Sequence, residues 1–244
     1  LGIRGSFEEG RPVFHSGTFV NGFHETFPII YGETAFGFAK TGQTMLDLAD
    51  AKLMRLFVDD EPFVIDFAHF HQFERDLDMR EGVLNRSILW ETPAGKQVQI
   101  SSTRLVSFEH RHLAAIDYEV TMLDASAPVV MVSEIQVPTH TDTQEGDPRK
   151  ARAFTERVLL RQLQRQEEAR IFLGHQTRNS GMSVVCGVDH VVDTPNAYRR
   201  EERLGEDEAS VTYRFQAKPG QSFRITKYFT YHTSHSVGCR ELAD

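Results

Sequence analysis

Apolar and polar residues alternate along most of the chain, in short runs that are separated by turn-forming residues. The clearest case covers Val211, Tyr213 and Phe215, which are followed by the turn sequence KPGQ at 218–221 and by a second alternating run at 223–231. Alternation on both sides of a Pro-Gly turn is typical of a β-hairpin, because successive side chains of a strand point to opposite faces. We therefore predict two antiparallel strands here.

The same pattern recurs upstream. It predicts further strands at 52–58 and 63–67 around a turn at 59–62, at 84–92 and 97–108 around a turn at 93–96, and at 114–122 and 129–137. Many of these residues are β-branched or aromatic, as is usual in strands. We predict an all-β fold: a large antiparallel super-sandwich of two sheets with few or no helices.

Two segments are harder to assign. Residues 157–168 carry leucines at helical spacing, but they can also form a strand that turns and returns through 171–173. We favour the hairpin, because the surrounding sequence is β. Residues 139–152 are polar and predict a long loop. Since neither half of the chain reads as a complete sandwich, we treat 1–244 as a single domain.

The composition suits a globular domain, with 40% hydrophobic and 25% charged residues. The formal net charge is −8 and no basic run stands out, so a nucleic-acid partner is disfavoured. No apolar run approaches the length of a membrane span, and we expect no membrane partner. Cys186 and Cys239 lie far apart without metal-ligand spacing. We interpret both as free thiols in a reducing compartment, which indicates a cytoplasmic protein.

Two histidine-rich segments are candidates for chemistry. On a strand, His69 and His71 point the same way, and Glu74 could complete a metal-binding face. The spacing to Glu74 is short for that purpose, so we interpret the histidines as solvated and expect no metal site. The sequence EHRH at 109–112 could supply the His acid and Glu base of a sugar mutarotase. An ion pair within a turn is the favoured interpretation.

The N-terminal stretches RGSFEEG at 4–10 and GTFVNGFHET at 17–26 are rich in glycine, phenylalanine and carboxylates. Aromatic faces can stack on sugar rings, and carboxylates can accept hydrogen bonds from hydroxyls. The same residues can equally form core and turns, and their chemistry alone leaves both interpretations open. Glu8 and Glu9 are adjacent, so on a strand they would face opposite ways and could not form a catalytic pair.

These N-terminal stretches resemble the opening of glycoside hydrolase family 65 proteins. Three further stretches are similar in the same order along the chain: LDMREG at 77–82, RLVSF at 104–108 and TRNSG at 177–181. The family includes maltose, trehalose and kojibiose phosphorylases and some trehalose hydrolases. The ordered series covers nearly the whole chain and carries the resemblance.

The resemblance implies that the chain is the N-terminal β-sandwich, shaped like a galactose mutarotase, of a larger enzyme. In that family a helical linker, a catalytic (α/α)6 barrel and a small C-terminal β domain follow the sandwich. The barrel is absent from residues 1–244, so we assign no catalytic residue and expect the isolated chain to be inactive. The parent enzyme would attack an α-glucosidic carbon with inversion, using inorganic phosphate as co-substrate or water. No cofactor is implied.

The resemblance further implies partners and a site. We expect the sandwich to pack on its own barrel through an exposed apolar patch, to shape the sugar site and to contribute to a homodimer. We predict that five residues lie near the carbohydrate: Arg4, Phe19, Asn21, Phe23 and Glu25. Two alternatives stay open, namely a free-standing carbohydrate-binding module and a mutarotase-like sugar epimerase.

Overall fold

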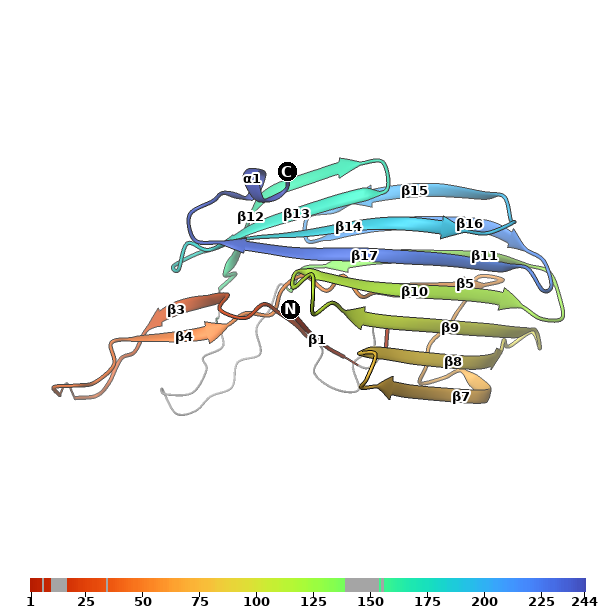
Figure 1. Ribbon diagram of the computed structural model, residues 1–244, viewed down its shortest axis with the longest axis horizontal. Helices are drawn as coiled ribbons and strands as arrows, with labels where there is room; N and C mark the ends of the chain where they lie inside the picture. Colours follow the sequence, from red (N-terminus) through yellow and green to blue (C-terminus); the bar gives the residue numbers. More distant parts are fainter. Residues whose placement is uncertain (6, 10–16, 34, 139–153, 155) are drawn as a thin grey trace.

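A computed structural model describes residues 1–5, 7–9, 17–33, 35–138, 154 and 156–244 of the chain. Two large sheets lie face to face (Figure 1), and the strands within each of them pair antiparallel. A short helix, α1 (Cys239–Leu242), follows the last strand. This β-sandwich confirms the predicted fold class. Among the described residues, no helix has the length and apolar character that a bilayer span requires.

The larger sheet has eight strands. Their order across the sheet is β12 (Leu159–Glu167), β13 (Arg170–Thr177), β14 (Ser183–Asp193), β17 (Ser222–Ser234), β10 (Leu113–Met122), β9 (Gln97–Val106), β8 (Val83–Glu91) and β7 (His69–Asp78). The smaller sheet has five, in the order β15 (Tyr198–Leu204), β16 (Glu208–Ala217), β11 (Ala127–Gln136), β5 (Met54–Val58) and β6 (Glu61–Pro62). Thus β7 and β12 are the edge strands of the larger sheet.

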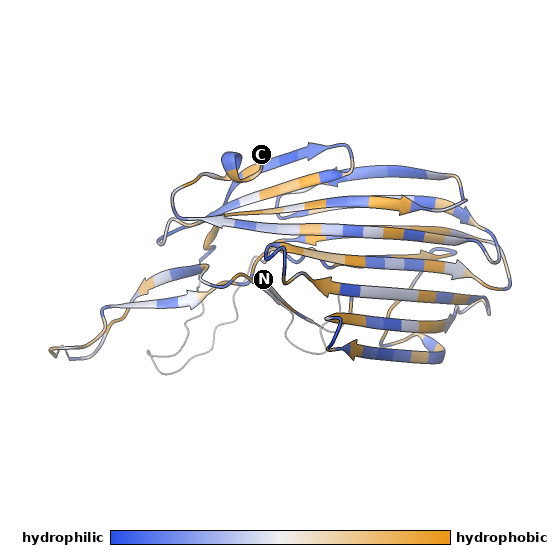
Figure 2. Ribbon diagram, in the orientation of Figure 1, coloured by the Kyte–Doolittle hydropathy of each residue, from blue (hydrophilic) through white to orange (hydrophobic). Residues whose placement is uncertain are grey.

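Alternation along the strands produces the core between the sheets. On β10, Ile116, Tyr118 and Val120 are buried, and they alternate with half-buried residues that face outward. Figure 2 shows the same alternation as orange and blue segments along the larger sheet. Because the period of two is maintained over strands of about ten residues, the hydrophobic pattern fixes which face is buried.

The hairpin interpretation of 157–168 is confirmed, because β12 and β13 pair along their length. The prediction of a strand at 63–67 is wrong. Only the two residues of β6 return along β5, and Phe63 then turns into the core, where it is 4% exposed. The chain leaves the sheet edge there and bends, with the Val64 carbonyl accepting two backbone hydrogen bonds. The loop predicted at 139–152 lies outside the described residues.

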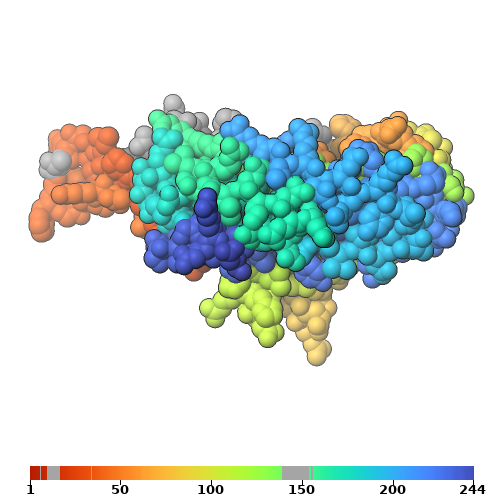
Figure 3. All heavy atoms as spheres, turned by 90° about the horizontal axis from the view of Figure 1, so that it is seen from above, coloured from red at the N-terminus to blue at the C-terminus, as the bar shows by residue number. Residues whose placement is uncertain are grey.

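Two small antiparallel pairs complete the fold. β1 (Gly2–Arg4) pairs with β2 (Gly17–Phe19), and β3 (His24–Pro28) pairs with β4 (Thr41–Met45). The second hairpin projects away from the sandwich body, as Figures 1 and 3 show, and we call it the arm. Several of its large apolar side chains are exposed: Ile30, Phe36, Phe38 and Met45.

Candidate functional site

The stretches that resemble family 65 meet at one end of the sandwich. The turns that follow β7, β9 and β13 all lie there, because strand direction alternates across the larger sheet (Figure 1). β1 lies at the same end, where the N-terminal amine contacts the Arg111 carbonyl at 3.4 Å. We call this the motif end, with turns at 79–82, 107–112 and 178–182. The other end, with turns at 92–96, 123–126 and 218–221, is the far end.

Two of the predicted substrate-proximal residues contact each other at the motif end. The Arg4 guanidinium on β1 lies over the Phe19 ring on β2, 5.5 Å from its centroid. That ring covers Gly17, where a Cβ would come within 2.5 Å of it, so only glycine fits beneath the aromatic ring. The Asp47 carboxylate accepts a hydrogen bond from the backbone of Thr18 at 2.7 Å, and burial raises its pKa to about 6. A cation, an aromatic face and a carboxylate therefore lie close together.

The next two predicted residues differ in exposure. Asn21 is exposed in the turn between β2 and β3, where a ligand or another domain can reach it. Phe23 is only 1% exposed and belongs to the hydrophobic core. The Phe23 side chain therefore packs into the core beneath the turn and does not face solvent.

Glu25 is fully buried and holds the arm to the sandwich. Its carboxylate accepts hydrogen bonds from the backbone N–H groups of Asn179 and Ser180, at 3.0 and 2.8 Å, and from that of Thr26 at 2.8 Å. The Ser180 hydroxyl and the Asn179 amide in turn donate to the carbonyls of His24 and Thr26. The TRNSG stretch thus forms a cradle for a carboxylate. Sequence reasoning did not connect Glu25 with that stretch.

A buried ion-pair cluster joins the N-terminal segment to the larger sheet. Arg86 on β8 forms a bidentate pair with Glu9, at 2.6 and 2.7 Å, and also lies 3.1 Å from Glu8. The Tyr118 hydroxyl donates to Glu9 at 2.8 Å. The two carboxylates converge because residues 8 and 9 form a turn rather than a strand, so the predicted opposite orientation is wrong. Burial, followed by the charge of Glu9, raises the pKa of Tyr118 well above its ordinary value.

Arg86 is a residue that sequence reasoning missed. Its inward position on β8, in line with Ile88 and Trp90, was the available signal. Burial acts to lower the pKa of Arg86, but Glu9 and Glu8 together outweigh it and raise that pKa above its ordinary value. The cluster contains no histidine among its described partners. Since every charge is paired, the cluster is suited to holding the N-terminal segment in place rather than to proton transfer.

An apolar surface occupies the motif end beside β1. Leu77, Met79, Leu105 and Phe108 are exposed there, with Met79 at 87% and Phe108 at 90%, and they border a shallow hollow of about 640 Å³. In Figure 3 the turns that carry Met79 and Phe108, in gold and yellow-green, stand out from the body. Exposed apolar side chains that gather in this way indicate an interaction surface.

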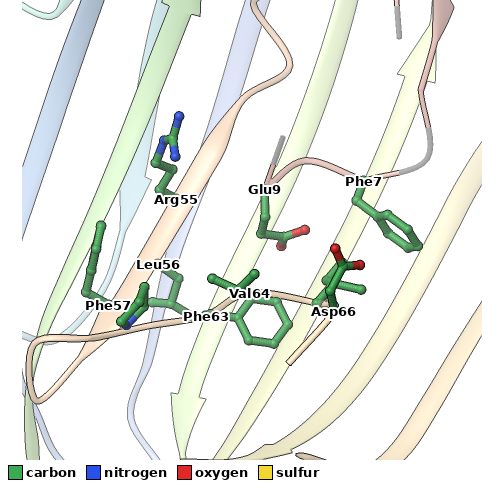
Figure 4. A pocket seen from close by; sticks show the side chains of 10 residues that line it. Phe7, Glu9, Arg55, Leu56, Phe57, Phe63, Val64 and Asp66 are labelled. Atoms are coloured by element: carbon green, nitrogen blue, oxygen red, sulfur yellow. The ribbon is translucent and has the colours of Figure 1, made fainter. Parts of the chain in front are cut away.

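A second cavity of about 340 Å³ is lined by the N-terminal segment, by β5 and by residues 62–66. Figure 4 shows the Glu9 carboxylate in it, with Phe7 on one side and Val64 and Phe63 below. Glu9 already has both oxygens bonded to Arg86, which leaves it poorly suited to binding a sugar hydroxyl. We therefore place the candidate functional site at the motif end and not in this cavity.

The histidine-rich segments are arranged differently from either predicted chemistry. Glu74 bonds Gln72 and not a histidine, whereas the His71 Nε2 atom lies 2.6 Å from Glu91 on β8. The His112 ring packs on that of His232, with centroids 4.5 Å apart.

Comparison with known proteins decides the family. The model of the glycosyl hydrolase family 65 N-terminal domain matches residues 1–244. The chain belongs to this family. This family 65 N-terminal domain is 33% identical over 238 residues to an alpha,alpha-trehalose phosphorylase of Thermoanaerobacter brockii, covering 96% of the chain and 31% of that protein. It is 37% identical over 231 residues to an uncharacterized glycosyl hydrolase of Mycobacterium tuberculosis, covering 95% of the chain and 29% of that protein.

A solved structure agrees with the fold of the family 65 N-terminal domain. A putative kojibiose phosphorylase from the human microbiome superposes with a TM-score of 0.82 at 16% identity, covering 99% of this chain and 30% of that one. The chain therefore spans less than a third of the length of these relatives. The family model identifies the chain as the N-terminal domain of family 65 glycosyl hydrolases.

Proposed function

We propose that this chain is the non-catalytic N-terminal domain of an enzyme that cleaves α-glucosidic disaccharides by phosphorolysis or hydrolysis. The observation that carries the proposal is the motif end, where the family-like stretches and an exposed apolar surface coincide. The catalytic domain of the same polypeptide would pack on this surface. Full burial of a side chain such as Phe108 is worth about 1.5–3 kcal/mol, so a few such contacts suffice to fix the two domains.

Trehalose is the substrate to test first. Two relatives named alpha,alpha-trehalose phosphorylase align along 96% and 61% of the chain, whereas relatives named kojibiose phosphorylase align along 51% and 55% and one named maltose phosphorylase along 54%. The full-length polypeptide that carries this chain should consume inorganic phosphate when trehalose is supplied. Glucose release without phosphate consumption would instead assign a hydrolase. Inactivity on trehalose by both routes would exclude trehalose, and inactivity on kojibiose and maltose as well would contradict the proposal. The two buried free thiols favour a reducing, cytoplasmic setting.

The packing role is tested with a matched pair of variants of the full-length polypeptide. Phe108→Ser removes an exposed apolar group at the motif end, and Leu123→Ser removes one at the far end. We expect Phe108→Ser to lower the thermal stability and the kcat of the full-length enzyme, and Leu123→Ser to change neither. Equal effects of both substitutions would refute docking at the motif end.

The substrate-proximal role of the N-terminal residues needs variants that spare the fold. Arg4 and Asn21 are exposed, whereas Phe23 and Glu25 are buried and would destabilise the domain if truncated. We expect Arg4→Gln and Asn21→Ala to raise KM of the full-length enzyme for its disaccharide, with no loss of thermal stability. Unchanged kinetics in both variants would remove these residues from the sugar site.

A further inference from the structure

Three side chains of the kinds that bind metal ions gather on the outer face of the larger sheet. His69 and His71 lie on the edge strand β7, and Glu91 ends the neighbouring strand β8. Their potential ligand atoms all lie within 4.8 Å of one another. His69 stands directly opposite Glu91 in the antiparallel register, which brings the two side chains to the same face.

A β-bulge brings the second histidine into this group. The register between β7 and β8 shifts between Phe70 and Gln72, so His71 is the extra residue of the edge strand. In a regular strand, side chains two positions apart are separated by about 7 Å along the strand. At the bulge the His69 and His71 rings approach to 5.0 Å between centroids. A bulge often serves to redirect a side chain in this way.

The two oxygens of Glu91 face different histidines. Oε2 lies 2.6 Å from His71 Nε2, and Oε1 lies 4.0 Å from His69 Nδ1. Two imidazole nitrogens and one carboxylate oxygen are a donor set typical of Zn²⁺, which takes a fourth ligand from solvent or elsewhere. We propose that His69, His71 and Glu91 bind a divalent transition-metal ion of the Zn²⁺ type.

The position of the three side chains at the edge of the larger sheet indicates what a bound ion would do. The side chains are 69%, 38% and 35% exposed for His69, His71 and Glu91, so small rotamer changes can close the distances around an ion. The site lies on a sheet edge, because β7 is the last strand in the order of the larger sheet and pairs with β8. An ion bound here joins the edge strand to the rest of the sheet. The site is also at the far end, away from the proposed docking surface.

Two other histidine pairs provide an internal comparison. His112 and His232 have ring centroids 4.5 Å apart, and His24 and His235 have centroids 6.3 Å apart. Among the described residues, the His69 group is the one in which a carboxylate joins two histidines within metal-binding distance. His112 is exposed, so His112→Ala is a matched control that removes one surface histidine without removing a member of the proposed site.

The test is a calorimetric titration of Zn²⁺ into the tag-free chain and into the variants His69→Ala, His71→Ala, Glu91→Gln and His112→Ala. We expect one ion per chain, and an affinity at least about tenfold weaker in each of the first three variants, since loss of even an outer partner of a metal ligand weakens binding about 10–100-fold. His112→Ala should bind as the unmodified chain does. Zn²⁺ should also raise the Tm of the unmodified chain but not that of His69→Ala.

Each variant changes an exposed or half-exposed side chain, so the fold should persist, and circular dichroism checks this. His69→Ala is the decisive variant, because the His69 imidazole lies 4.0 Å from Glu91, farther than the 2.6 Å between His71 and Glu91. The proposal is overturned if the unmodified chain binds no Zn²⁺, or if His69→Ala and His112→Ala bind it equally well. Imidazole NMR signals of His69 and His71 that stay unchanged on Zn²⁺ addition would overturn it as well.

Discussion

The two ends of the sandwich are built from the same strands but differ in their turns. At the far end the turns close by local backbone hydrogen bonds, such as that from Gly95 to the Thr92 carbonyl, and neighbouring turns bond to one another, as when the Gln97 backbone donates to Asp124. At the motif end the turns are joined to segments distant in sequence, as when Glu25 binds the backbone of Asn179 and Ser180. The far-end turns bond to neighbouring turns of the sheets, whereas the motif-end turns also bond to the N-terminal segment and to the arm.

The difference shows how one fold can separate stability from function. Alternating strands need only a turn to form a sheet, so the far end requires little beyond turn chemistry. The motif end carries buried charges, a projecting arm and exposed apolar side chains, which are costly features that a sandwich alone does not need. Buried charges and exposed apolar side chains lower the stability of the isolated domain. They are therefore expected at the surface where the domain binds a partner.

The largest effect should come from the buried charge cluster near the motif end. Arg86→Met leaves the carboxylates of Glu8 and Glu9 buried without their main partner, so we expect a loss of about 3–5 kcal/mol in the free energy of unfolding. Arg224→Met, which breaks an exposed pair with Glu119 toward the far end, should cost about 0–1 kcal/mol. Urea denaturation of both variants measures the two losses. Equal losses would show that the buried pair at Arg86 contributes no more than the exposed pair at Arg224.

A smaller loss is expected when the anchor of the arm is removed. Glu25→Ala leaves the backbone N–H groups of Asn179 and Ser180 without their acceptor, and we expect a destabilisation of about 2–3 kcal/mol. The arm should also become more sensitive to limited proteolysis. Asp124→Ala at the far end removes one hydrogen bond to the exposed Gln97 backbone and should cost about 0.5–1 kcal/mol. If the arm keeps its protease resistance in Glu25→Ala, Glu25 is not its anchor.

Lys227 lies between the two ends of the sandwich, and its burial should make the stability of the domain depend on pH. It lies on β17, and its Nζ atom donates to the carbonyls of Leu53 and Glu134, at 3.1 and 2.8 Å, with no carboxylate among these acceptors. Burial lowers the pKa of Lys227 from 10.5 to about 7. Between these values the unfolded chain holds a proton that the folded chain has lost, so the free energy of unfolding rises with pH in this window.

The rise should amount to about 1–2 kcal/mol between pH 7 and pH 8.5, since a full proton contributes about 1.4 kcal/mol per pH unit. Burial raises the pKa of Cys186 to about 12, which acts in the opposite direction at higher pH, so the measurement stops at 8.5. Lys227→Met should flatten the curve, while Lys218→Met in an exposed far-end turn should leave it unchanged. If the free energy of unfolding of Lys227→Met still rises between pH 7 and 8.5, another group causes the rise.

Most strands could be predicted from the sequence, because a period of two over ten residues is a local signal. The hairpin at β16 and β17 and the strands β8 to β11 follow directly from it. The strand predicted at 63–67 failed because the burial of Phe63, a tertiary contact, overrides local β propensity. The site was harder to predict. The pairing of Arg4 with Phe19 follows from neighbouring strands, but Glu25 and Asn179 are separated by 154 positions, and no local pattern indicates that contact.

The smallest effect on folding, and the one that bears most directly on function, concerns the exposed apolar residues of the motif end. Met79→Ser and Phe108→Ser change side chains that make few contacts within the chain, so each should shift the free energy of unfolding of the 244-residue chain by no more than about 0.5 kcal/mol. The same substitutions should reduce self-association of the chain at high concentration, measured by sedimentation velocity, because they remove apolar surface that water solvates poorly. Leu123→Ser at the far end should leave self-association unchanged.

A large loss of stability in Phe108→Ser would mean that this residue supports the fold itself. The motif end would then lose its distinction as a surface kept apolar for a partner.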